Sequence, residues 1–90
     1  MDTERLNCIR QNYNRVKANA RRTQANAVAS EKVLATSSIE EEGASFINEL
    51  ITEVQYWRKR HAIWLSRCKY WKRALRKEVE YIRQELEARK

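Results

Sequence analysis

Two stripes of apolar and small side chains, each spaced alternately by three and four residues, constrain the fold of this chain more than any other feature. The first stripe consists of Leu6, Ile9, Tyr13, Val16, Ala20, Thr23, Ala27, Ser30 and Leu34. The second consists of Ile47, Leu50, Val54, Trp57, His61, Trp64, Cys68, Trp71 and Leu75. Such heptad spacing is typical of α-helices that pack along a shared seam. We therefore expect two long helices and an all-α fold.

Turn residues are almost absent from the sequence. Its 90 residues include no proline and one glycine, and 34% of them are charged. A β fold needs more turns than this composition supplies, whereas long helices need few. A chain of this length forms one small domain, so we expect a single helical domain over residues 1–90.

The turn between the two helices is predicted at about residues 36–44. Ser37 and Ser38 each precede a glutamate by three residues, which is the pattern of a helix-capping box. This pattern favours a turn at about 36–38, with the second helix beginning near Ile39. An alternative places the break at Gly43 with Ser45 as the cap of the second helix. The sequence leaves both arrangements open.

A short connection makes the helices antiparallel neighbours, the first at about 3–36 and the second at about 39–89. Folding about the turn places small residues of the first stripe opposite larger ones of the second, as with Ala20 and His61. Close packing favours this complementarity of size. The sequence therefore predicts an antiparallel, coiled-coil-like helical hairpin in which residues 79–90 extend past the first helix.

The extension carries apolar residues that have no partner within the hairpin. After Leu75 the stripe takes an extra four-residue step, a stutter, and continues with Val79, Ile82 and Leu86. A chain of this size has only a small core. We therefore expect these three residues to serve in oligomerisation, and two hairpins to pair as a homodimeric four-helix bundle.

Charge is segregated along this basic chain, whose formal net charge is +7. Residues 5–30 and residues 57–77 contain bases and no acid, whereas residues 37–56 contain five glutamates and no base. The hairpin brings the two basic blocks side by side and makes the turn an acidic tip. A basic shaft indicates a polyanionic partner, and nucleic acid is the first candidate.

The predicted contacts with phosphate are the basic residues of the shaft, namely Arg10, Arg15, Lys17, Arg21, Arg22, Arg58, Lys59, Arg60, Arg67, Lys69, Lys72 and Arg73. Asparagine alternates with the cations of the first helix, although it is a poor helix former. Cationic side chains bind phosphates, and amides reach sugar hydroxyls. We expect binding without sequence preference, and duplex RNA favoured over DNA, because a long helical face suits the shape of A-form RNA.

This layout resembles the small nodaviral suppressors of RNA silencing, in which helical hairpins pair into a four-helix bundle. The resemblance is one of architecture and involves no shared motif. It implies a homodimer that binds duplex RNA. The residues leave a second function open, in which the chain is a coiled-coil scaffold or a regulatory module that docks on an acidic protein.

No catalytic constellation accompanies these patterns. His61 is the only histidine, Cys8 and Cys68 lie far apart, and neither metal-ligand spacing nor a glycine-rich phosphate loop is present. We expect no enzyme activity, no cofactor and no metal. The chain lacks an apolar run of roughly 18–20 residues that would cross a bilayer, and two cysteines are too few for a secreted disulfide scaffold. We therefore expect an intracellular protein, cytoplasmic or nuclear.

Overall fold

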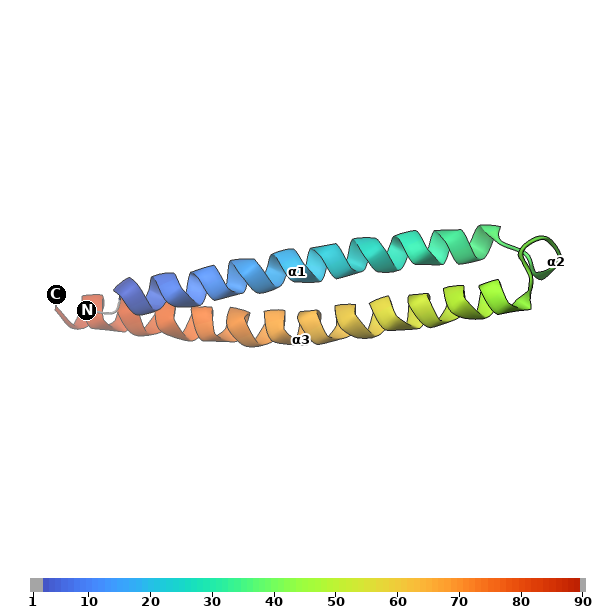
Figure 1. Cartoon of the computed structure of the whole chain (residues 1–90). Coiled ribbons are helices and arrows are strands. Elements are labelled where there is room, and N and C mark those ends of the chain that lie inside the picture. The colour runs from blue at the N-terminus through green and yellow to red at the C-terminus, as the bar shows by residue number, and fades with distance from the viewer. Residues whose placement is uncertain (1–2, 90) are drawn as a thin grey trace.

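The computed structural model describes residues 3–89 as two long antiparallel helices joined by a compact turn (Figure 1). Helix α1 spans Thr3–Thr36, the short helix α2 spans Ile39–Glu42, and helix α3 spans Ala44–Ala88. The molecule measures 73 × 16 × 14 Å along its principal axes. No strand occurs in the described part of the chain, and the predicted all-α helical hairpin is confirmed.

The two predicted stripes form the seam between α1 and α3. Seven stripe residues are buried, namely Val16, Ala20, Thr23, Ala27, Ser30, Leu50 and Val54. His61 lies opposite Ala20, with its Nδ1 atom 3.1 Å from the carbonyl oxygen of Ala20 and 3.4 Å from Oγ1 of Thr23. The register expected from the sequence is therefore present at the middle of the hairpin.

Enlarging a small seam residue is expected to destabilise the hairpin. Ala20 is 6% exposed and lies against His61, so Ala20→Leu would insert three carbons into a packed seam and cost roughly 1–3 kcal/mol. Ala25→Leu, on the exposed side of α1, is the matched control and should change the free energy of unfolding by less than about 0.5 kcal/mol. Urea denaturation followed by circular dichroism measures both. Equal losses would show that α1 does not pack through this seam.

The turn combines the two arrangements that the sequence leaves open. Ser38 caps α2, since its hydroxyl oxygen accepts a hydrogen bond from the N–H of Glu41 at 3.2 Å. The chain breaks again at Gly43, whose φ of 88° is one that glycine adopts without steric penalty. The second break divides the helix expected from residue 39 into α2 and α3. The alternative cap at Ser45 is wrong, because Gly43 occupies the N-cap position and Ser45 lies in the first turn of α3.

The seam near the chain ends departs from the predicted stutter. Glu78 is buried, with 6% exposure, whereas Val79 is half-buried. The next buried seam position after Leu75 is therefore Glu78, three residues on, and not Val79, four residues on. Burial of a carboxylate there is accompanied by an ion pair across the seam, in which Nε of Arg5 lies 3.3 Å from Oε2 of Glu78. The other oxygen, Oε1, has no hydrogen-bond partner among residues 3–89.

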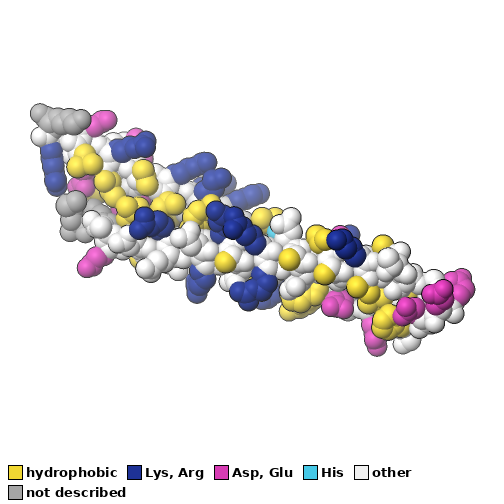
Figure 2. All heavy atoms as spheres, turned by 90° about the horizontal axis from the view of Figure 1, so that it is seen from above, with side chains coloured by type: hydrophobic (Ala, Val, Ile, Leu, Met, Phe, Trp, Pro, Cys, Tyr) yellow, Lys and Arg dark blue, Asp and Glu magenta, His cyan; other side chains and the backbone are white. Residues whose placement is uncertain are grey.

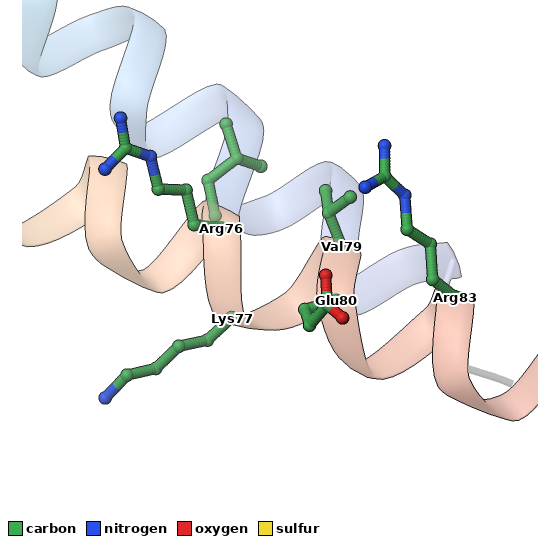
Figure 3. Close-up of a pocket in the computed structure, with 6 residues that line it drawn as sticks. Arg76, Lys77, Val79, Glu80 and Arg83 are labelled. Carbon is green, nitrogen blue, oxygen red and sulfur yellow. The ribbon is translucent and has the colours of Figure 1, made fainter.

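Helix α3 continues from this ion pair past the first residues of α1 (Figure 1). Of the predicted oligomerisation residues, Val79 and Ile82 are half-buried and Leu86 is 51% exposed. A shallow groove runs along this extension, beside Val79, with Arg76 and Arg83 on either side (Figure 3). Tyr81 is also exposed on the extension, and the rest of the hairpin leaves further large apolar side chains exposed, namely Val28, Val33, Ile39, Phe46, Ile51, Tyr56, Ile63, Leu65 and Tyr70.

Candidate nucleic-acid interface

The two basic blocks of the sequence lie side by side along the shaft. The contact of His61 with Ala20 and the ion pair of Glu78 with Arg5 align residues 57–77 of α3 with the N-terminal half of α1. Lysine and arginine side chains line both edges of the middle of the molecule, and acidic side chains gather at the tip (Figure 2). The charge segregation expected from the sequence is therefore also a segregation in space.

Most of the predicted contact residues are available to a ligand. Eleven of the twelve are exposed, and Lys17 is half-buried. Among the described residues, Arg58 is the one member of the set that takes part in an ion pair, because its Nε donates to Oε1 of Glu31 at 2.6 Å. The carboxylate of Glu31 already neutralises Arg58, so Arg58 is the least suited of the twelve to bind phosphate.

A hollow on one side of the seam brings cations and amides of both helices together. Its lining residues are Asn19, Arg22, Thr23, Asn26, Tyr56, Trp57, Arg60 and Trp64. We call it the amide hollow. The sequence predicts that Arg22 shares a flank of α1 with the two asparagines. It does not identify Arg60 and Tyr56 as their neighbours across the seam, because that contact depends on how α3 is rotated about its axis.

The asparagines of α1 orient neighbouring arginines. Nη2 of Arg10 donates to Oδ1 of Asn7 at 2.9 Å, and Nη2 of Arg15 donates to Oδ1 of Asn12 at 3.4 Å. A guanidinium has five N–H donors, so one bond to an amide leaves the remaining donors for phosphate oxygens. These bonds give a physical reason for asparagine within a helix that it otherwise weakens.

Aromatic rings hold two further cations. The guanidinium of Arg67 lies 4.6 Å from the ring centre of Trp64, and the Lys17 ammonium lies 5.7 Å from that of Tyr13. Contacts of this kind attract the cation to the face of the ring. The three tryptophans are half-buried along the seam, so their rings serve mainly to pack the hairpin and to position basic side chains.

Comparison with protein-family models, with curated proteins and with solved structures yields no match. Within residues 3–89, no group of three or more His, Cys, Asp or Glu side chains is placed to hold a metal ion. No described helix combines the length and the apolar character that crossing a membrane requires. The geometry and charge of the shaft are therefore the features of this chain that bear on its function.

Proposed function

We propose that this chain binds the phosphate backbone of nucleic acid along its basic shaft, prefers double-stranded RNA, and acts by binding rather than by catalysis. The observation that carries the proposal is a shaft with eleven predicted contact residues that have no ion pair among the described residues. The block at residues 57–77 is roughly 30 Å long. One turn of B-DNA measures about 34–36 Å, so the shaft matches about one duplex turn.

The preference for RNA is supported by the amide hollow. Asn19 and Asn26 lie there beside Arg22 and Arg60, so amide groups accompany the cations that bind phosphate. The 2′-hydroxyl group both donates and accepts hydrogen bonds, and it distinguishes RNA from DNA. The two-helix shaft is 16 × 14 Å in cross-section. It is therefore wider than the major groove of B-DNA, which is about 12 Å wide and admits a single helix, whereas the minor groove of A-form RNA is wide and shallow.

We further propose that two hairpins associate as a four-helix bundle. A single hairpin buries few large apolar side chains and exposes many, and association of copies is the usual remedy for a small core. Val79, Ile82 and Leu86 extend the apolar surface beyond α1.

We also propose that the chain acts within the cell, in the cytoplasm or the nucleus, because its proposed ligand is duplex RNA.

Fluorescence anisotropy with three matched probes tests the proposal. Duplex RNA, duplex DNA and single-stranded RNA of equal length would be titrated with protein between about 50 and 200 mM salt. We expect duplex RNA to bind most tightly, to remain bound at physiological salt, and to tolerate changes of sequence. Weak binding to all three probes that is lost by physiological salt would contradict the proposal.

A second candidate function is a scaffold that docks on an acidic protein. The groove on the extension favours it, because its lining combines apolar Leu75 and Val79 with three bases and one acid, namely Arg76, Lys77, Arg83 and Glu80. Deleting residues 79–90 separates the two functions. A scaffold would lose its protein partner while the hairpin remains helical, whereas an RNA-binding protein would lose little affinity, and only through weaker dimerisation.

Arg60→Ala is expected to weaken duplex-RNA binding more than Arg58→Ala does. Arg60 lies in the amide hollow without a described ion pair, whereas Arg58 is neutralised by Glu31. Loss of one phosphate contact should lower the slope of log affinity against log salt by about one unit for Arg60→Ala. The same titration of the two variants measures this difference. Equal slopes would contradict the assignment of the free cations as the contacts.

A further inference from the structure

One row of exposed side chains on α3 has the symmetry of a surface that pairs with itself. Glu49, Tyr56, Ile63, Tyr70 and Lys77 recur every seven residues and therefore follow one line along the helix. We call them the α3 row. The two tyrosines lie at equal distances from Ile63, and the glutamate and the lysine lie at equal distances beyond them. About Ile63 the row is thus symmetrical in size and opposite in charge.

The side chains of the α3 row are exposed on the surface of the hairpin. Tyr56, Ile63 and Tyr70 are 53%, 38% and 65% exposed, and both charged ends are exposed as well. Tyr56 borders the amide hollow, and Tyr70 and Lys77 border a second hollow on the seam beside the Arg5–Glu78 ion pair. Large apolar and aromatic groups that recur along one exposed line indicate a contact surface.

Both tyrosines of the row are braced in the same way. The Tyr56 ring meets Trp57 edge-on, with ring centres 5.0 Å apart and an angle of 78°, and Tyr70 meets Trp71 at 5.3 Å and 85°. Equivalent neighbours hold the two rings in equivalent positions. A twofold interface requires that the residue at a given distance before the axis fit the residue at the same distance after it. The row offers tyrosine against tyrosine at seven residues and glutamate against lysine at fourteen.

We propose that the α3 row binds a second copy of the chain, with the two α3 helices antiparallel and the twofold axis at Ile63. The inference rests on the dimer of the proposed function and places its contact on the α3 row, rather than on Val79, Ile82 and Leu86. Ile63 meets the partner's Ile63, Tyr56 meets the partner's Tyr70, and Glu49 meets the partner's Lys77. The contact spans about 42 Å from Glu49 to Lys77.

Charge selects the antiparallel orientation. In a parallel pair, Glu49 would face the partner's Glu49 and Lys77 the partner's Lys77, and such like charges repel. The antiparallel pair replaces both repulsions by attractions. The acidic tip of each hairpin then lies against the basic shaft of its partner.

The centre of the interface couples dimerisation to the proposed ligand. Arg60 and Arg67 flank Ile63 on α3, so the antiparallel pair brings four guanidinium groups near the twofold axis. Their mutual repulsion opposes association, and a bound phosphate backbone offsets it. A ligand that binds the dimer better than the monomer raises the stability of the dimer. Duplex RNA should therefore lower the dissociation constant of the dimer.

Disulfide trapping in the full chain tests the geometry. The background carries Cys8→Ser and Cys68→Ala, which remove both native thiols. We expect Ile63→Cys to form a disulfide-linked dimer under mild oxidation. We also expect Tyr56→Cys to link to Tyr70→Cys when the two variants are mixed, and neither to link to itself. The matched control is Leu65→Cys, which is 43% exposed but off the row, and should not link.

Three outcomes would overturn the inference, and they differ in what they say of the proposed dimer. Self-linking of Tyr56→Cys would show a parallel pair, and linking of Leu65→Cys without Ile63→Cys would show another face of α3; in both cases the dimer itself stands. Analytical ultracentrifugation of the unmodified chain provides the remaining outcome. A monomer at all concentrations, with or without duplex RNA, would remove both the dimer and its contact face.

A charge swap tests the pairing of the row ends. Glu49→Lys and Lys77→Glu should each raise the dissociation constant of the dimer roughly tenfold, because each variant turns two attractions per dimer into repulsions. The double variant restores opposite charges at both ends and should return the constant to its original value. A double variant that dimerises more weakly than either single variant would contradict the proposed register.

Discussion

Replacing Arg15 and Arg22 by glutamate is expected to remove duplex-RNA binding at physiological salt. Both residues are exposed on α1, one heptad apart, which is about 10.5 Å along the helix. Arg15 is oriented by Asn12, and Arg22 lies in the amide hollow. At about 1.4 kcal/mol for each lost phosphate contact, the affinity should fall at least roughly a hundredfold. Anisotropy titrations of duplex RNA measure the loss.

The salt dependence of binding by the same variant distinguishes the loss of phosphate contacts from a general effect of the lower net charge. Loss of two phosphate contacts should lower the slope of log affinity against log salt by roughly two units. Lys32→Glu combined with Arg89→Glu is the matched control, because it makes the same change in net charge at exposed positions outside the basic blocks. An equal loss of affinity and slope in this control would contradict a binding site on the shaft. Circular dichroism of both variants confirms that the hairpin remains folded.

The architecture of the hairpin was predictable from the sequence because it follows from the helical repeat. Heptad spacing determines which side chains share a face, and the match of small with large residues determines the register, as at Ala20 and His61. Local turn chemistry was only half predictable. The capping box at Ser38 is confirmed, whereas the second break depends on the conformation of Gly43, which the sequence offers only as an alternative.

The candidate site was predictable as a charge pattern but not as a set of contacts. Which cations lie on the shaft follows from counting residues. Residue counting does not reveal which of these cations is already neutralised, because the ion pair between Arg58 and Glu31 joins residues on different helices. The α3 row was visible in the sequence as the recurrence of tyrosine on either side of Ile63. Only the structure shows that the row is exposed and can therefore contact a partner.

Glu78→Leu is expected to stabilise the hairpin by roughly 1–4 kcal/mol, the range found when buried charges give way to apolar groups of similar size. Glu78 lies on the seam with 6% exposure, where the heptad pattern calls for an apolar residue. Its Oε1 has no hydrogen-bond partner in the described part of the chain, and its Oε2 pairs with Arg5, whose side chain is 72% exposed. A pair so open to water offsets little of the cost of burying the carboxylate. Urea denaturation of the variant measures the gain.

A double-mutant cycle with Arg5→Gln tests the reason for this gain. In the original chain, Arg5→Gln should destabilise the hairpin by less than about 1 kcal/mol, because the exposed guanidinium offsets only a small part of the cost of burying the Glu78 carboxylate. In the Glu78→Leu background the same substitution should have no effect, since no carboxylate remains to be compensated. If Glu78→Leu instead destabilises the protein, Oε1 has a partner in solution that residues 3–89 of one chain do not supply.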